Sequence, residues 1–322
     1  MLASPPHTAK IPSYITTADE LVNNNIKEIP TLIHPIFPKV GVIAVAGSSD
    51  TGKSSLLRQL AMEIVSGKET FLRFPINAKH RSVLYISTED DYNALSCTLK
   101  MQNTTSSSGQ TFKGLRFIFD TTHILAKVES ELEREPVDLI IVDAFSDLYG
   151  HDMNRANEVR TYIQNFSNLA IEHQCLLVFL HHTGKKTEDN PPSKNNMLGS
   201  QGFEAKMRVV VELRKDFNDL SGARRHFCIV KGNYLAETFK NRSYVLNFTN
   251  TLTFNNTGSR VAFEELAPQN NGRGRDQAAV ARALELRAEG NTIAQIHENM
   301  ESEGFSQSES AIGKYVRGIP RG

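Results

Sequence analysis

One short run of residues has the types and spacing of a phosphate-binding loop. It spans Gly47–Ser54 and fits the pattern G-x-x-x-x-G-K-[ST] throughout. Small residues let backbone N–H groups approach phosphate oxygens closely, while Lys53 would reach the β- and γ-phosphates as a catalytic cation and Ser54 would ligate Mg²⁺. The run therefore predicts binding of a nucleoside triphosphate, expected to be ATP with Mg²⁺. The expected binding residues are Gly47, Ser48, Ser49, Asp50, Thr51, Gly52, Lys53, Ser54 and Ser55.

A second apolar run ends in an acid. Val137–Asp143 has the form of a Walker B strand, which makes Asp143 the candidate second residue, with Ser54, on the metal side of the phosphates. The alternative reading is a strand-ending aspartate that caps the next turn. No second acid follows Asp143 directly, because Ala144, Phe145 and Ser146 come next. The general base must therefore come from elsewhere in the chain.

A third apolar run, Val83–Ser87, leads into Thr88, Glu89 and Asp90. If this strand neighbours the strand of the phosphate-binding loop, its carboxyl end brings Glu89 to the phosphates. Glu89 is then the candidate for positioning the attacking water. An acidic N-terminus of the following helix is the alternative interpretation.

Two adjacent histidines follow the strand pattern Leu176–Leu180. His181 and His182 would face the γ-phosphate from the next strand along and could sense it by hydrogen bonding. A satisfied histidine at a strand end is an equally open interpretation.

The elements that must position these residues alternate between strand and helix patterns, which predicts an α/β fold with a mostly parallel twisted sheet covered by helices. The later strands follow one another with little helix between them, so we expect an antiparallel extension at one edge. The strand patterns are Val42–Ala46, Ser82–Ser87, Leu115–Phe119, Leu139–Asp143, Leu176–His181, Arg208–Leu213, Phe227–Lys231 and Tyr244–Phe248.

The length and composition favour a core domain with a small second domain. The chain has 322 residues, and its 36 Lys and Arg balance its 36 Asp and Glu, so overall charge favours neither nucleic acid nor membrane. We expect a leader packing on the core over 1–40, the ATPase domain over 41–266, a polar linker over 267–275 and a C-terminal domain over 276–322. Alanine- and leucine-rich Asp276–Glu289, then Ile293–Met300 and Glu309–Arg317, predict three short helices of a helix-turn-helix-like, all-α module.

The environment expected for the chain is the cytoplasm. The three cysteines are far apart and have no paired spacing, which is typical of core thiols in a reducing compartment. The N-terminus lacks the order of a signal peptide, and no stretch holds eighteen apolar residues. We therefore expect no membrane association.

The order of these motifs resembles the RecA-like ATPases, especially the hexameric replicative helicases of plasmid RepA type. The resemblance rests on the phosphate-binding loop, the acid-ended strand Tyr85–Asp90, Asp143, and His181–Gly184. The leader and the run Gly199–Arg208 also fit, so that residues 15–250 or so are covered. The resemblance implies a RecA-like P-loop core in a homo-oligomer, expected to be a hexamer, whose sites lie between subunits.

The resemblance also implies residues that act on a neighbouring subunit or on DNA. A basic finger would reach the neighbour's γ-phosphate, and Arg208 is its first candidate. Lys231 is the second, although a solvated strand end explains it as well, and Gly232 and Asn233 stand where an additional arginine is often found. RecA-like proteins place a DNA-binding loop after the histidine strand, and the polar segment Thr183–Asn196 fills that place. Its lysines are Lys185, Lys186 and Lys194, and Glu188 and Asp189 offset part of their charge. A mobile, solvated loop with no ligand is the alternative interpretation.

The C-terminal module allows two interpretations. Lys314 and Arg317 lie on its last helix, which would be the recognition helix of a helix-turn-helix that binds duplex DNA. A small bundle that docks on a protein is the other.

These features predict an ATP-dependent DNA motor, of the RepA-type replicative helicase class of a plasmid or mobile element, that binds single strands in a central channel. The alternative is a RecA-like regulatory or recombination ATPase that assembles on duplex DNA without unwinding it. A P-loop binding protein with no DNA role is the third hypothesis.

Overall fold

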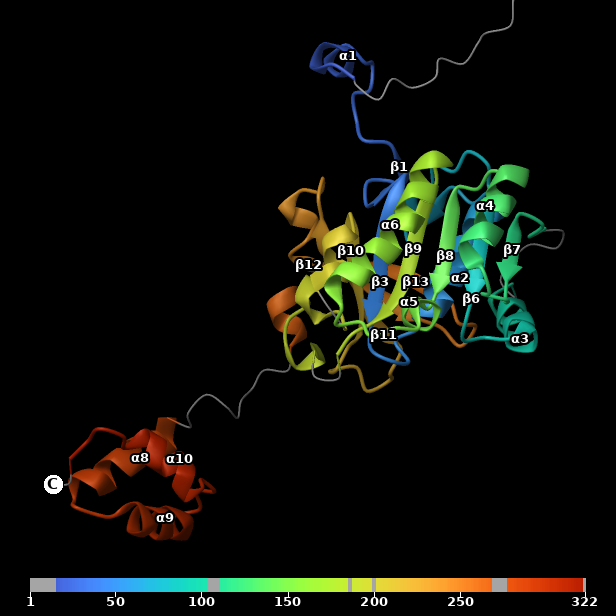
Figure 1. Ribbon diagram of the computed structural model, residues 1–322. Helices are drawn as coiled ribbons and strands as arrows, with labels where there is room; N and C mark the ends of the chain where they lie inside the picture. The colour runs from blue at the N-terminus through green and yellow to red at the C-terminus, as the bar shows by residue number, and fades with distance from the viewer. Residues whose placement is uncertain (1–15, 104–110, 185–186, 199–200, 268–276, 321–322) are drawn as a thin grey trace, which may run out of the picture. The chain divides into compact units, whose positions relative to one another are not determined.

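The chain folds into two compact units, Met1–Leu266 and Ala267–Gly322. The computed structural model describes residues 16–103, 111–184, 187–198, 201–267 and 277–320 (Figure 1). The first unit is a mixed α/β structure, and the described part of the second contains helices only. None of the described helices is long and apolar enough to cross a membrane.

A nine-stranded sheet forms the centre of the first unit (Figure 1). Its parallel part contains, in spatial order, β10 (Val209–Lys215), β3 (Gly41–Gly47), β9 (Leu176–His182), β8 (Leu139–Asp143), β6 (Val83–Ser87) and β7 (Leu115–Ile118). Beyond β10 the sheet continues by antiparallel pairing through β11 (Arg224–Gly232), β12 (Arg242–Phe248) and β13 (Phe254–Ala262). The predicted fold class, a mostly parallel sheet with an antiparallel extension, is confirmed.

The parallel strands divide their side chains between two apolar cores, one on each face of the sheet. On β3, Ile43 and Val45 enter one core and Val42 and Ala44 enter the other, as the alternation of a strand requires. The helix α2 (Lys53–Val65) packs in the first core, while α4 (Ile124–Arg134) and α6 (Ala156–Glu172) pack in the second. Because both faces are covered, the central strands β3, β6, β8 and β9 are mostly apolar, which explains the continuous apolar runs of the sequence.

The smaller elements of the first unit sit around this sheet. The antiparallel pair β1–β2 contributes Leu32 and Phe37 to the core that contains α2, whereas α1 buries none of its residues. The bounds of the smaller elements are α1 (Ala18–Val22), β1 (Thr31–Ile33), β2 (Phe37–Pro38), β4 (Thr70–Phe71), β5 (Phe74–Pro75), α3 (Tyr92–Gln102), α5 (Phe145–Tyr149) and α7 (Gln201–Lys206).

The last strand of the sheet, β13, was not among the predicted strands because it lacks an apolar run. Phe254 is its only buried residue, and the rest of the strand is polar or half-exposed. The side chain of Gln59 on α2 donates to the Phe254 carbonyl at 3.0 Å and accepts from the Phe254 N–H at 2.6 Å. A side-chain amide thus takes the place of a neighbouring strand and ties β13 to α2.

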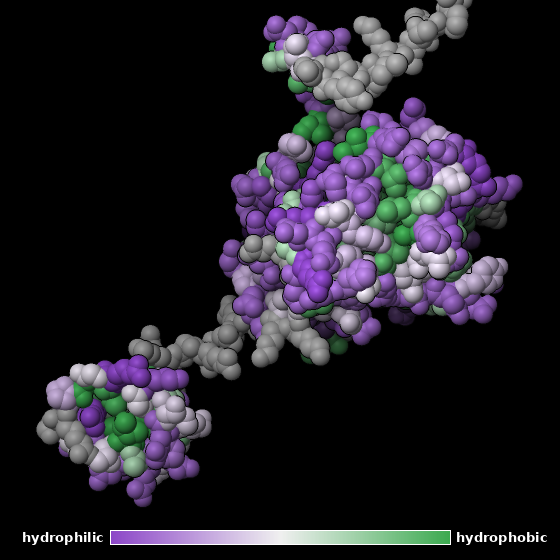
Figure 2. All heavy atoms as spheres, in the orientation of Figure 1, coloured by the Kyte–Doolittle hydropathy of each residue, from purple (hydrophilic) through white to green (hydrophobic). Residues whose placement is uncertain are grey.

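The C-terminal unit is built from α8 (Gln277–Ala288), α9 (Ile293–Ser302) and α10 (Glu309–Tyr315). Thr292 begins α9 with a capping box that includes Gln295, and Ser308 caps α10. The three helices share a small core, and Figure 2 shows hydrophobic residues gathered at the centre of this unit with hydrophilic residues around them. The core residues are Ala279, Ala283, Leu286, Ile296, Met300, Ile312 and Val316.

Candidate active site

The polar residues that follow the parallel strands meet at one edge of the sheet. In the strand register, Gly47 at the end of β3 is opposite His182 at the end of β9. Ser87 at the end of β6 is opposite Asp143 at the end of β8. Because parallel strands end on the same side, the loops after β3, β6, β8 and β9 converge where an open α/β sheet binds ligands.

Two glycines allow the phosphate-binding loop to adopt its shape. Gly52 has φ +92°, a left-handed conformation that disfavours side chains, and a Cβ there would approach the Phe254 ring to 2.8 Å. A Cβ on Gly47 would lie 2.4 Å from the Leu213 carbonyl. The helix α2 begins directly after Gly52, so its N-terminal N–H groups and positive dipole end are at the loop.

Lys53 is buried beside several carboxylates. Its ammonium donates to the Ser48 carbonyl at 2.8 Å, and the residue is 6% exposed. Burial lowers the pKa of Lys53, while Glu89, Asp143, Asp50 and Glu188 act in the opposite direction. A buried ammonium beside backbone donors makes the loop a site for a polyanion.

Asp143 is the candidate metal ligand of the site. The Tyr85 hydroxyl donates to Asp143 Oδ2, and the Ser54 hydroxyl also hydrogen-bonds this carboxylate. Burial raises the pKa of Asp143, against the effect of these hydrogen bonds. Its Oδ1 is buried and has no protein partner among the described residues. An unpaired carboxylate oxygen beside a serine hydroxyl fits Mg²⁺, which takes one or two protein oxygens together with phosphate oxygens and water.

Glu89 lies at the site, but the expected adjacency of its strand is wrong, because β9 and β8 separate β6 from β3. Neighbouring residues hold Glu89 in place. Its Oε1 is 3.4 Å from His182 Nε2. The next residue, Asp90, makes a 2.9 Å ion pair with Arg58 of α2, and Arg58 is only 4% exposed. The helix that starts at the phosphate-binding loop therefore also fixes the loop that carries Glu89.

The two histidines point to different surroundings. His182 reaches Glu89, whereas His181 is fully buried, stacks on Phe203 at 4.3 Å between ring centroids and bonds the Leu198 carbonyl at 2.7 Å. Burial lowers the pKa of His181 to about 4, so the ring is neutral at physiological pH. The expectation that both histidines face the phosphate is thus corrected, because neighbours on a strand point to opposite faces. His182, which reaches Glu89, remains the candidate sensor.

The two candidate fingers lie away from the phosphate-binding loop of their own chain. Arg208 precedes β10 and donates to the Val40 carbonyl at 3.1 Å, level with the amino end of β3. Lys231 pairs with Glu204 at 2.7 Å and lies opposite Val210 in the sheet. Neither contacts the site that its own chain builds, so a role for either at a phosphate requires a second copy.

Of the candidate DNA contacts, the structure describes Lys194, Lys314 and Arg317. Lys194 is half-exposed and lies 3.8 Å from Glu204. Lys185 and Lys186 lie outside the described residues. Lys314 and Arg317 are exposed in the C-terminal unit, Lys314 on α10 and Arg317 just after it.

Two residues of the antiparallel extension, Arg225 and Phe248, support the phosphate-binding loop. The sequence patterns did not indicate either of them as a site residue. Arg225 Nε donates to the Thr51 carbonyl at 3.1 Å, and the guanidinium lies over the Phe248 ring at 5.4 Å from its centroid. Phe248 in turn stacks on Phe254 at 4.5 Å. These residues come from strands far along the chain, so no local spacing connects them to the loop.

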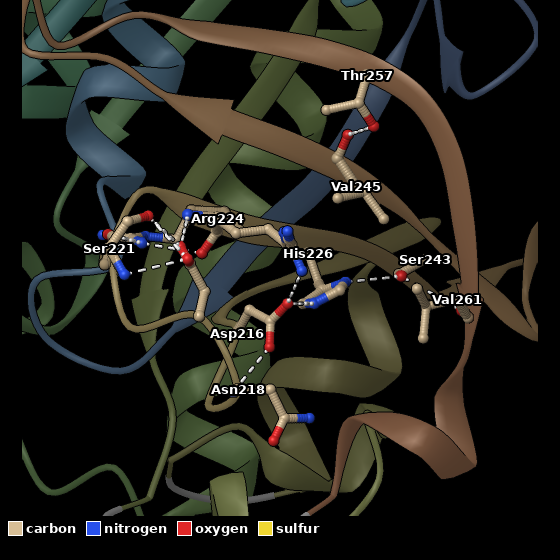
Figure 3. Close-up of polar contacts among 12 residues, drawn as sticks. Asp216, Asn218, Ser221, Arg224, His226, Ser243, Val245, Thr257 and Val261 are labelled. Atoms are coloured by element: carbon tan, nitrogen blue, oxygen red, sulfur yellow. Dashed lines mark hydrogen bonds and ion pairs between the residues drawn. The ribbon is translucent and has the colours of Figure 1, made fainter.

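A polar network fixes the connection between β10 and β11, next to Arg225 (Figure 3). Asp216 lies 3.2 Å from the Arg224 guanidinium and 3.3 Å from His226 Nε2, while His226 Nδ1 hydrogen-bonds the Ser243 hydroxyl at 2.9 Å. An Asp–His–Ser chain of this kind activates serine in some hydrolases. Here Ser243 is fully buried and donates to the Val261 carbonyl at 3.2 Å, so the network serves to join β10, β11, β12 and β13.

The comparisons with known proteins agree with this geometry. Residues 5–188 match the family model described as the AAA domain. Among solved structures, a KaiC-like protein of the hyperthermophilic archaeon Pyrococcus horikoshii OT3 is similar, with a TM-score of 0.50 and 12% identity over 70% of this chain and 93% of that one. At this identity the likeness concerns the fold alone. The search of curated proteins found no match.

We predict that Glu89→Gln retains ATP binding and loses turnover by about 100-fold or more, because the amide cannot accept a proton from the attacking water. Binding of a fluorescent ATP analogue and release of phosphate measure the two properties separately. The matched control is Glu129→Gln, an exposed residue on α4. Unchanged hydrolysis in Glu89→Gln would assign the water to another residue.

We predict that His181 makes the first unit sensitive to acid. A histidine whose folded pKa is about 4 and whose unfolded pKa is 6.5 binds more protons when unfolded, so its contribution to stability is complete above pH 6.5 and falls as the pH drops toward 4. Between pH 7 and pH 5 this residue should remove about 2 kcal/mol from the free energy of unfolding.

Urea unfolding of the wild type and of His181→Phe at both pH values measures this effect. The phenylalanine keeps the stacking on Phe203 and cannot titrate, so its loss of stability with acid should be smaller. Equal losses in the two proteins would show that His181 is not the group responsible.

Proposed function

Since the chain belongs to the AAA domain family and is a P-loop ATPase of RecA-like fold, we propose that it is an ATP-dependent DNA motor that works as a homo-oligomer. In finer terms we propose a RepA-type replicative helicase, expected to be a hexameric ring. The observation that carries the proposal is a direct contact: the segment after β9, where RecA-like proteins place a DNA-binding loop, hydrogen-bonds the phosphate-binding loop through Glu188 and Ser48.

The residues at the strand ends have distinct roles in hydrolysis. Lys53, now bonded to the Ser48 carbonyl, turns to the phosphates when ATP enters and stabilises the charge on the transferred group. Ser54 and Asp143 would hold Mg²⁺, which would neutralise phosphate charge when bound. Glu89 orients the attacking water and accepts its proton, and His182 keeps the Glu89 carboxylate in place.

A shared site follows from the positions of the basic residues. Arg208 and Lys231 lie toward the amino ends of the parallel strands, while the phosphate-binding loop follows the carboxyl end of β3. A ring in which one copy presents this side to the next copy's phosphate-binding loop brings a cation to each γ-phosphate. The transition state then forms only when two subunits meet.

The alternative is a regulatory or recombination ATPase that assembles on duplex DNA without unwinding. The observation that favours it lies in the C-terminal unit, where Lys314 and Arg317 are exposed at the last helix of a compact three-helix structure. In such a protein the last helix would enter the major groove.

We predict that single-stranded DNA stimulates the ATPase and that the rate per chain rises with protein concentration. The measurement is phosphate release over a range of concentrations, with and without single strands, using Lys53→Ala as the blank. A slow rate indifferent to single strands would contradict the motor and favour the regulatory ATPase. Strand displacement that needs ATP then separates unwinding from assembly on duplex DNA.

We also predict that mixing Arg208→Ala with Lys53→Ala restores activity that neither variant has alone. A mixed interface can pair an intact phosphate-binding loop with an intact Arg208, so activity should peak near equal proportions. The control is Arg242→Ala mixed with Lys53→Ala, since Arg242 is exposed on β12. No recovery at any ratio would count against Arg208 acting on a neighbour.

A further inference from the structure

Glu188 is an acidic residue that hydrolysis does not require, yet it contacts the phosphate-binding loop directly. The Ser48 hydroxyl donates a hydrogen bond to its carboxylate, across 140 positions of sequence. Glu188 is half-buried in a single 3₁₀ turn, Thr187–Asp189. It was not among the residues that the sequence indicated, because an acid within a polar loop has no distinctive spacing.

The turn that carries Glu188 is anchored to β10 by a buried ion pair. Arg214 donates to the Asn190 carbonyl at 2.8 Å and to the Thr187 carbonyl at 2.9 Å. Its partner Glu212, 3.2 Å away, accepts from the Ser193 N–H at 3.0 Å. Both charged residues are only 2% exposed, so residues 187–196 are held on β10 and meet the phosphate-binding loop at Glu188.

The contact between Ser48 and Glu188 opposes the charge of a nucleotide. Glu188 is one of the carboxylates that act on Lys53, together with Glu89, Asp143 and Asp50. The triphosphate brings further negative charge to the same loop. The Glu188 carboxylate, within hydrogen-bond distance of Ser48, repels the triphosphate, and partial burial of the site strengthens this repulsion. The proposed mechanism uses Glu89 for the water and Asp143 for Mg²⁺, whereas it gives Glu188 neither role.

We infer that Glu188 sets the affinity for nucleotide and couples it to the segment 187–196. Bound phosphates expel the carboxylate from Ser48, and the segment on which it sits shifts with it. The coupling is reciprocal: a ligand that holds this segment in the shifted position tightens nucleotide binding by the same factor. The inference rests on the proposed function only in requiring that the loop binds a nucleoside triphosphate.

The test compares nucleotide affinity in two matched variants. Glu188→Gln keeps an acceptor for Ser48 and removes the charge, and should bind a fluorescent ATP analogue about tenfold more tightly than the wild type. Asp189→Asn removes the same charge from the exposed neighbouring residue and should leave the affinity unchanged. Equal affinities in the wild type and both variants would overturn the inference while leaving the proposed ATPase intact. Failure of the wild type to bind would overturn both.

A second measurement follows the movement itself. The chain contains no tryptophan, so Asn195→Trp places a single fluorophore in the exposed part of the segment. Adding ATP should change its emission, and the change should shrink when Glu188→Gln is combined with it, because a neutral side chain is not expelled. An equal change in both proteins would overturn the proposed displacement.

Discussion

The site depends on holding one ammonium, that of Lys53, out of water until a polyanion arrives. Burial disfavours the charge, and the carboxylates of Glu89, Asp143, Asp50 and Glu188 compensate for it. Asp143 ends β8, and the other three acids come from the loops after β3, β6 and β9. The parallel order of the strands therefore serves the charge balance of the site as well as packing. It brings the carboxyl ends of the strands, and with them these acids, to one edge of the sheet.

The antiparallel extension of the sheet supports the phosphate-binding loop. Arg225 holds the Thr51 carbonyl and Phe254 fills the space over Gly52, so the shape of the phosphate-binding loop is fixed by β11 and β13. The network from Asp216 through His226 to Ser243 keeps those strands in register. Contacts from β11 and β13 therefore fix the phosphate-binding loop. The contact that we propose to change on nucleotide binding is the hydrogen bond between Ser48 and Glu188.

The site residues that could be predicted from the sequence are those with a fixed spacing along the chain. The residues that meet only after folding could not be predicted. The phosphate-binding loop, Asp143 and Glu89 were predictable because each directly follows an apolar strand, and the fold class followed from the order of those strands; the catalytic roles stay predictions. Strand alternation alone could have separated His181 from His182. Glu188 and Arg225 could not be found this way, because they meet the loop across 140 and 174 positions of chain. β13 is polar, and its place in the sheet follows from its pairing with β12 and from the bonds of Phe254 to Gln59.

The paired hydrogen bonds between Gln59 and Phe254 connect helix α2 directly to strand β13. Gln59 lies in the helix that begins at Lys53, and Phe254 begins the nine-residue strand that leads to Leu266, the last residue of this unit. A displacement of α2 is shared by β13 through two bonds that are buried from water. The helix that begins at Lys53 is thus bonded directly to the strand that leads toward the end of the first unit.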